Sequence, residues 1–375
     1  MERADPLPAR EALPYMRQLD GVRAVAIAGV LFQHLLEGSA KVFPAGAIGV
    51  RVFFVLSGFL ITGILLRARP EDERTSVRQA LRTFYARRIL RIAPLFYLAL
   101  AVVAALNVAD VRGRFWWHAT YLSNYYFAAY GQTHLPDAHL WSLAVEEQFY
   151  LVWPAVIFLT PRRLLVPAIL LTISCGPVFR AGVSLLHWRG AAVWAPTPGC
   201  LDSLGAGALL ALCADPSRGV THLRRPLIRI CRYVGIPLLA FVLLLHGLDV
   251  LVGVRRIFFD LAIAMAGVAL VDATSRGFDG MVGRLLSAGP VVYAGVISYG
   301  IYVWHPFVAH YVRAAWCPEA DFSNPRFYAS AVVTLVVSFA IASLSWFLFE
   351  RPITRLKRHF DYGIPTRQTF TDVRE

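Results

Sequence analysis

The sequence predicts an all-α fold, a polytopic integral membrane bundle of about ten transmembrane helices. Two observations favour this class. Of the 375 residues, 57% are hydrophobic and only 16% are charged, whereas a soluble domain carries about 25% charged residues. The apolar residues also gather in runs of about 18–22, the length that crosses about 30 Å of hydrocarbon as a helix. A β-barrel would instead alternate apolar and polar residues in segments of about ten, a pattern that this sequence lacks.

We expect the spans at about 21–37, 45–66, 92–109, 140–160, 163–182, 199–214, 233–252, 257–273, 290–312 and 328–349. The third and eighth runs are short, so the count stays open at roughly eight to eleven. Ser57 and Gly58, in the second run, allow two helix backbones to approach closely. All of 1–375 is expected to form one transmembrane domain, with no soluble domain appended.

The basic residues predict the orientation in the membrane. With the N-terminus inside, the cytoplasmic segments are the tails (about 1–20 and 350–375) and the loops 67–91, 161–162, 215–232 and 274–289. These segments hold most of the 37 Lys and Arg residues, a bias that places both termini in the cytoplasm. Topology therefore explains the net charge of +13, which gives no support to a nucleic-acid partner. The N-terminal tail lacks the apolar stretch of a cleaved signal peptide.

The cysteines are scattered through apolar stretches and form no C-x-x-C motif. They are Cys175, Cys200, Cys213, Cys231 and Cys317. We interpret them as reduced core residues, and we expect neither a disulfide framework nor a metal site.

Ionisable groups inside apolar spans are costly, and they mark candidate functional residues. In the first span, Arg23 and His34 are eleven residues apart, so they share one helix face and are separated by about 16 Å along the axis. An arginine near the inner surface can hold a phosphate, and a neutral histidine can accept a proton from a hydroxyl. A snorkelling arginine and a packing histidine are the alternative interpretation.

Arg87, Arg88 and Arg91 lie where the chain is expected to re-enter the membrane, just before Pro94 in the first turn of the third span. Their spacing groups them on one side of a helix, and such a cluster suits a pyrophosphate or a 3′-phosphate. For any single one of these arginines, anchoring of the helix end at the cytoplasmic membrane surface is an equally good interpretation. Part of the segment 67–91 has helical spacing and is expected to lie on the membrane surface.

Glu146 and Glu147 follow Trp141 at the start of the fourth span. Adjacent helical residues point about 100° apart, so one carboxylate can face the interior and the other the headgroups. A buried Glu146 could orient His34 and stabilise its imidazolium. An ion pair with a membrane arginine is the alternative.

The ninth span places Ser298, Tyr302 and His305 on one face, and Pro306 is positioned to bend the helix. These groups suit contacts with a hydroxyl-rich substrate or hydrogen bonds between helices. The residues alone favour the second interpretation.

Taken together, these stretches resemble acyltransferase family 3, the membrane O-acyltransferases. The matching motifs, over about residues 15–352, are Arg23-x10-His34, FFVLSGFLI (53–61), RRILRIAPLFY (87–97), WSLAVEEQFYL (141–151), LDSLGAGALLA (201–211), SYGIYVWHPF (298–307) and FERP (349–352). One position departs from the family, whose members often carry Arg where this sequence has Cys200.

The resemblance implies about ten helices in the inner membrane of a bacterium and an acyl-CoA donor, with acetyl the commonest acyl group, bound from the cytoplasm without a resident cofactor or metal. It implies a carbohydrate acceptor: known classes include O-antigen, exopolysaccharide, Nod factor, peptidoglycan and macrolides, so a lipid-linked glycan or a glycosylated small molecule would fit. Some members carry an additional C-terminal soluble domain. The residues expected to support the substrates or the fold are Asp20, Ser57, Trp141, Ser142, Glu147, Tyr150, Ser298, Tyr302 and His305.

The mechanism expected from these residues starts with Arg23, Arg87, Arg88 and Arg91 holding the donor phosphates. His34, oriented by Glu146, then deprotonates the acceptor hydroxyl for attack on the thioester. An acyl-histidine intermediate is a variant that the sequence does not separate. The rival interpretations are a carrier or flippase for glycans or lipids and a membrane scaffold. The carrier would favour inverted hydropathy repeats, which the sequence does not show.

Overall fold

The computed structural model describes residues 15–36, 39–69, 76–188, 190–317 and 323–360. These residues form helices and connecting loops and contain no strand, which confirms the all-α prediction. The expected tails, about 1–20 and 350–375, and residues 70–75 of the basic segment lie largely outside the described residues. The prediction of a single domain over 1–375 stays a prediction.

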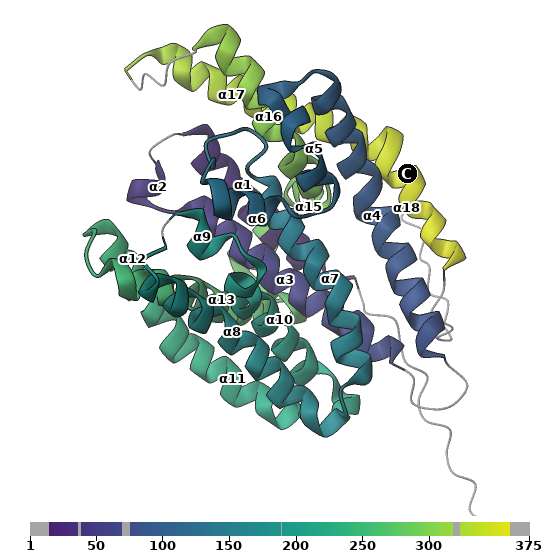
Figure 1. Ribbon diagram of the computed structural model, residues 1–375. Coiled ribbons are helices and arrows are strands. Elements are labelled where there is room, and N and C mark those ends of the chain that lie inside the picture. Colours follow the sequence, from purple (N-terminus) through teal and green to yellow (C-terminus); the bar gives the residue numbers. More distant parts are fainter. Residues whose placement is uncertain (1–14, 37–38, 70–75, 189, 318–322, 361–375) are drawn as a thin grey trace, which may run out of the picture.

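The α-helices are α1 (Arg17–Leu35), α2 (Ser39–Val42), α3 (Ala45–Ala68), α4 (Val77–Ala105), α5 (Val111–Ala119), α6 (Ser123–Tyr130), α7 (Leu140–Leu159), α8 (Leu165–Leu185), α9 (Ala191–Trp194), α10 (Leu201–Ala214), α11 (Arg224–Ile230), α12 (Ile236–Gly247), α13 (Val252–Arg276), α14 (Gly280–Leu286), α15 (Gly289–Val296), α16 (Ser298–Trp316), α17 (Pro325–Ser345) and α18 (Arg351–Arg355). Figure 1 shows α3, α7, α8, α10 and α13 packed together, with α4 running beside α18 at one edge.

Within the described residues, eight helical segments are long and apolar enough to cross a membrane, or nine if the bent pair α15–α16 counts as one span. Nine of the ten expected spans thus have a counterpart. The remaining expected span, 21–37, corresponds to the helix α1, which is not among the segments long and apolar enough to cross a membrane. Asp20 and Arg23 lie near its start and His34 near its end, and these polar side chains lower its hydropathy.

Two details of the expected spans are wrong. The third span does not begin near residue 92, because α4 runs without a break from Val77 and joins the basic segment to the span. Pro94 therefore lies inside α4 and not in a first turn. The ninth span bends by 70° between Val296 and Ser298, and Pro306 lies within the following helix α16.

Glycines bring α3 and α10 into contact. A Cβ atom on Gly58 would lie 1.9 Å from the carbonyl oxygen of Leu204, and one on Gly207 would lie 2.0 Å from that of Val55. Because real Cβ atoms do not approach so closely, no other residue fits at either place without moving a backbone. The close approach predicted at Ser57-Gly58 is confirmed.

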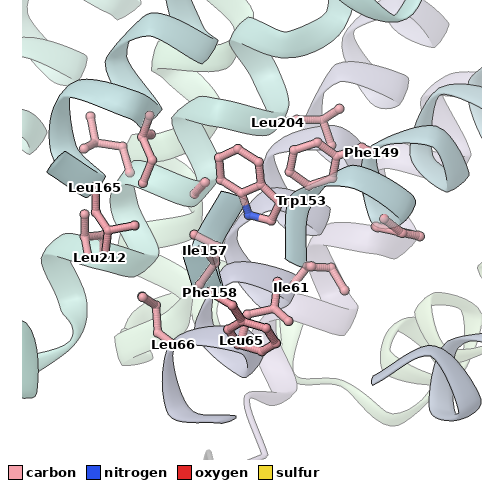
Figure 2. Close-up of a cluster of buried hydrophobic side chains, with 14 of the residues drawn as sticks. Ile61, Leu65, Leu66, Phe149, Trp153, Ile157, Phe158, Leu165, Leu204 and Leu212 are labelled. Atoms are coloured by element: carbon pink, nitrogen blue, oxygen red, sulfur yellow. The ribbon is translucent and has the colours of Figure 1, made fainter. Parts of the chain in front are cut away.

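A hydrophobic core lies where α3, α7, α8 and α10 meet (Figure 2). The ring of Trp153 stacks on Phe149 with centroids 4.8 Å apart. Its indole nitrogen donates to the hydroxyl of Thr62 at 2.8 Å, which satisfies the one polar atom of this buried side chain. The core fixes α7 against α3, and these two helices carry much of the candidate site.

The connection between α4 and α7 is held by a buried charged cluster. Asp137, which is fully buried, accepts hydrogen bonds from Arg114 Nε and from the ring of His118, both at 2.8 Å. Burial alone would raise the pKa of Asp137, but the hydrogen bonds from His118 and Arg114 outweigh burial and lower it. The charged carboxylate therefore stabilises this connection.

Replacing Asp137 with asparagine is expected to cost about 3–5 kcal/mol, because Arg114 would remain buried without its counter-charge. Since folding lowers this pKa, the stabilisation is present above the unfolded value of about 3.9 and is lost as the pH falls through the folded value. The Tm of Asp137→Asn in detergent should thus lie well below that of the wild type above about pH 5, and the gap should narrow as the pH falls below about 4 toward the lowered folded pKa. An unchanged Tm, equal to that of a control at the exposed Asp279 (Asp279→Asn), would contradict this account.

Candidate active site

Three cavities follow one another through the bundle. The arginine cavity (about 430 Å³) is lined by Arg23, Arg87, Arg88, Arg91 and Lys357 among others. The glutamate cavity (about 130 Å³) is lined by Ser57, Glu146, Glu147, Tyr150, Ser298 and Tyr299 among others. The histidine cavity (about 640 Å³) is lined by His34, His139, Trp141, Trp194, Arg51 and Arg256 among others.

Shared lining residues show that the cavities adjoin. Arg88 and Arg91, on α4, line both the arginine and the glutamate cavities. Val50 and Tyr302 line both the glutamate and the histidine cavities. The glutamate cavity is therefore the middle compartment, between a strongly basic end and an end that contains His34.

The arginine cavity holds a large excess of positive charge. All four arginines predicted to hold the donor line it, together with Lys357, and Asp20 is the one acidic residue of its lining. Asp20 forms an ion pair with Arg23 and also accepts a hydrogen bond from Tyr15 at 2.7 Å. The lining thus carries five basic side chains and one carboxylate, an excess of positive charge that suits a ligand with several phosphate groups.

The four arginines are held differently. Arg87 donates to the carbonyl oxygens of Lys357 and Phe360, so it secures the segment that follows α18. Arg88 lies over the ring of Tyr150, with its guanidinium carbon 4.9 Å from the ring centroid. Arg91 makes no hydrogen bond or ion pair to any described residue, although it lines two cavities. Arg88 and Arg91 are therefore the best placed to bind an incoming anion.

The adjacent residues Glu146 and Glu147 both line the glutamate cavity. Tyr150 donates to Glu146 at 3.2 Å, and its hydroxyl is also in short contact with Ser57. Glu147 has one carboxylate oxygen that is buried without a hydrogen-bond partner among the described residues. Both side chains line the cavity, and the contact of one of them with the headgroups stays a prediction. Both glutamates are half-buried, and Arg23 and Arg88, which line the same cavity, offset their negative charges.

His34 is bound to His305. The His34 Nδ1 and His305 Nε2 atoms are 2.8 Å apart, and the two rings stack at 5.1 Å. The Nδ1 atom of His305 lies 3.0 Å from the carbonyl oxygens of Ile301 and Tyr302, so this nitrogen must carry a proton. In the neutral ring, Nε2 of His305 is then an acceptor, and His34 Nδ1 donates to it.

This assignment leaves the lone pair of His34 on Nε2. His34 lines the histidine cavity, and Val50 and Tyr302 of the same lining also line the glutamate cavity. A neutral imidazole held in this tautomer can take a proton from a hydroxyl or attack a carbonyl carbon.

The structure does not bring His34 and Glu146 together by a hydrogen bond. Glu146 is bonded to Tyr150 in the glutamate cavity, whereas the hydrogen-bond partner of His34 is His305 on α16. His305, and not Glu146, is therefore the residue that the geometry places to orient the ring of His34. The catalytic roles of His34 and Glu146 stay predictions.

The other predicted residues lie close to the same path. Ser142 and Tyr302 form a hydrogen bond of 2.6 Å, and Tyr302 donates to the carbonyl oxygen of His139 at 2.8 Å. Ser298 lines the glutamate cavity and Trp141 the histidine cavity. Tyr302, on α16, is therefore held by α7 and its N-cap residue His139 where the two cavities adjoin.

The sequence analysis missed a buried network at the histidine cavity. Arg51 donates to Asp260 at 2.7 Å, and Arg180 donates to Asp202 at 2.6 Å and approaches Asp260 at 3.4 Å. Each of these residues is a single charge inside an apolar stretch, the same signal that pointed to Arg23. Arg51 also donates to the sulfur of Cys200 at 2.9 Å. Other helices thus supply guanidinium groups next to the position where the family often carries Arg.

Four of the five cysteines are buried and Cys175 is half-buried, and no disulfide joins any of them in the part of the chain that the structure describes. Among the described residues, no three His, Cys, Asp or Glu side chains are grouped in a way that could hold a metal ion.

Comparison with known proteins decides the family. A family model described as an acyltransferase domain matches residues 16–343. The chain belongs to the acyltransferase 3 family. The match spans every helix that carries a predicted site residue, and the spans make this family member a multi-pass membrane protein.

Curated relatives of this acyltransferase 3 chain include bacterial O-acetyltransferases. The peptidoglycan O-acetyltransferase OatA of Listeria monocytogenes is 30% identical over 92% of the chain and 57% of its own length. YrhL of Bacillus subtilis, whose name provisionally gives it the same activity, is 31% identical over 90% of the chain and 55% of its own length. The chain thus spans little more than half of the curated relatives it matches. The comparison with solved structures found no match.

Proposed function

We propose that this acyltransferase 3 protein transfers an acyl group, most simply acetyl, from acyl-CoA to a hydroxyl of a carbohydrate. The observation that carries the proposal is the series of adjoining cavities that leads from an excess of positive charge to the Nε2 atom of His34. The family and the names of the relatives support the acyl chemistry and, for those relatives, an acetyl group.

The donor binds first at the arginine cavity in this proposal. Arg23, Arg88 and Arg91 hold its phosphates, and the pantetheine arm extends through the glutamate cavity. Arg23 and His34 are both on α1, about 16 Å apart along the helix axis. An arm of pantetheine length covers this distance and brings the thioester to the junction at Tyr302.

The transfer itself uses His34 as a general base. Nε2 removes the proton of the acceptor hydroxyl as the oxygen attacks the thioester carbonyl carbon. The imidazolium formed keeps its Nδ1 proton bonded to His305. The tetrahedral intermediate then expels the thiolate, which takes the proton from Nε2, so that an ester and a free thiol are formed. An acyl-His34 intermediate is the variant, and acid quenching of a reaction with labelled donor distinguishes it by label retained on the protein.

The proposed setting is the cytoplasmic membrane of a bacterium, with both termini and the arginine cavity on the cytoplasmic side. Acceptors in this setting are carbohydrates that reach the membrane, including lipid-linked glycans and glycosylated small molecules. Neither a resident cofactor nor a nucleic acid takes part.

Release of free thiol from acetyl-CoA tests the proposal. Purified protein should release thiol faster when glycan acceptors are added, and the acyl group should appear as an ester on the glycan. A protein that moves glycans into proteoliposomes without cleaving the thioester would be a carrier, and this result would overturn the proposal.

The tautomer argument makes a prediction for His305. His305→Leu removes the acceptor of the His34 Nδ1 proton and is expected to lower kcat about tenfold, since a buried N–H is left without a partner. KM for the donor should not change, because His305 does not line the arginine cavity. His305→Gln keeps an acceptor near the position of Nε2 and should restore most of kcat. If both variants lost Tm and activity together, His305 would have only a structural role, and the tautomer argument would be contradicted.

A further inference from the structure

The histidine cavity is the largest of the three cavities, and the glutamate cavity lies between it and the donor arginines. Two tryptophans line it, Trp141 from α7 and Trp194 from α9, with their ring centroids 4.8 Å apart and their planes at 71°. Phe259 adds a third aromatic ring. Aromatic surfaces with a few polar groups are typical of sites for small ligands, and the C–H faces of sugar rings pack on such surfaces.

Most charges around this cavity cancel. Arg51 and Arg180 are matched by Asp260 and Asp202, all four of them buried and joined in one network. This network is already satisfied, so it is poorly suited to bind an additional ion.

Two further arginines begin α13 at the edge of the same cavity. Arg255 forms an ion pair with Asp249 at 3.1 Å. Arg256 lines the cavity and has no hydrogen bond or ion pair with any described residue. Four guanidinium groups thus face three carboxylates, and the positive charge left over is that of Arg256. A ligand that fills the cavity would place a negative group next to it with little competition.

We infer that the histidine cavity binds the acceptor, and that this acceptor is a glycan that carries an anionic group, a phosphate or a carboxylate, which Arg256 recognises. The inference rests on the proposed function, because His34 must reach a hydroxyl of the bound sugar. The tryptophans hold the sugar ring, Arg256 holds the anionic group, and Nε2 of His34 faces the ring hydroxyls. Donor and acceptor therefore approach His34 from opposite cavities.

The experiment compares three probe acceptors with purified protein and acetyl-CoA: N-acetylglucosamine, its 1-phosphate and glucuronate. Transfer to each sugar and its binding at equilibrium are measured for the wild type and for Arg256→Gln. Arg326→Gln is the matched control, since Arg326 is exposed at the start of α17 and lines none of the three cavities. Thiol release without any acceptor is measured in parallel.

The wild type is expected to bind one or both anionic sugars at least about tenfold more tightly than the neutral sugar, because hydrogen bonds between ionised groups are stronger than neutral ones. Arg256→Gln should lose this preference, while thiol release without acceptor and KM for acetyl-CoA stay unchanged. Preference for the phosphate over the carboxylate, or the reverse, identifies the anionic group.

Equal affinity for the three sugars, a preference that survives in Arg256→Gln, or no binding of any of them by a protein that still cleaves acetyl-CoA would overturn the inference. A wild-type protein that does not cleave acetyl-CoA at all would instead overturn the proposed function.

Discussion

Replacing His34 with alanine is expected to lower acyl transfer by about 10²- to 10⁴-fold, the usual contribution of a general base. The physical reason is that the Nδ1 atom of His34 is bonded to His305, which leaves the lone pair on Nε2 available as a base. His34 also lines the histidine cavity. The measurement is the initial rate of ester formation at saturating donor and acceptor. Donor binding should be retained, because the arginine cavity lies at the other end of α1.

His310→Ala provides the matched control. His310 is on the same helix as His305, but it is exposed and lines none of the three cavities. It should keep the wild-type rate. If His34→Ala transfers acyl groups as fast as this control, His34 is not the base, and the mechanism would have to start from another group such as Glu147.

The second large effect is expected from the double variant Arg88→Gln/Arg91→Gln. Two charge-assisted contacts of about 1.5 kcal/mol each correspond to a roughly 10²-fold increase in KM for acetyl-CoA. Both residues lie at the boundary of the arginine and glutamate cavities, and neither has a carboxylate partner among the described residues.

A phosphate-free donor separates this role from a structural one. With S-acetyl-N-acetylcysteamine, which keeps the thioester and lacks the phosphates, the double variant and the wild type should have the same kcat/KM. Arg82→Gln, an exposed arginine of α4 outside the cavities, should behave like the wild type with both donors. An equal loss with the short thioester would mean that Arg88 and Arg91 do not act on the phosphates.

The fold class and most of the spans could be predicted because hydrophobic length is a local property of the sequence. The errors arose where the decisive interaction is not local. The start of α4 could not be read from hydropathy, because its first turns are basic but continue an apolar helix. The bend at Ile297 could not be distinguished from one at Pro306, because a proline can also be accommodated inside a helix.

The candidate site was predicted as a set of residues but not as a set of pairs. Single charges inside apolar spans pointed to Arg23, His34 and Glu146. The partner of His34 could not be found in this way, because His305 is 271 residues away and its position depends on the packing of α16 against α1. The network of Arg51, Asp260 and their neighbours carried the same local signal but was not used, since its members fall in different spans.

The central claim is that one protein joins thioester cleavage to ester formation at His34. The most direct measurement follows acetyl-CoA labelled in its acetyl group, incubated with purified protein and a mixture of neutral and anionic glycans. We predict one free thiol for each base-labile acetyl ester recovered on glycan, with both products lost in His34→Gln and retained in His310→Ala. Thiol release that persists undiminished in His34→Gln, or glycan movement across vesicles without thiol release, would contradict the account.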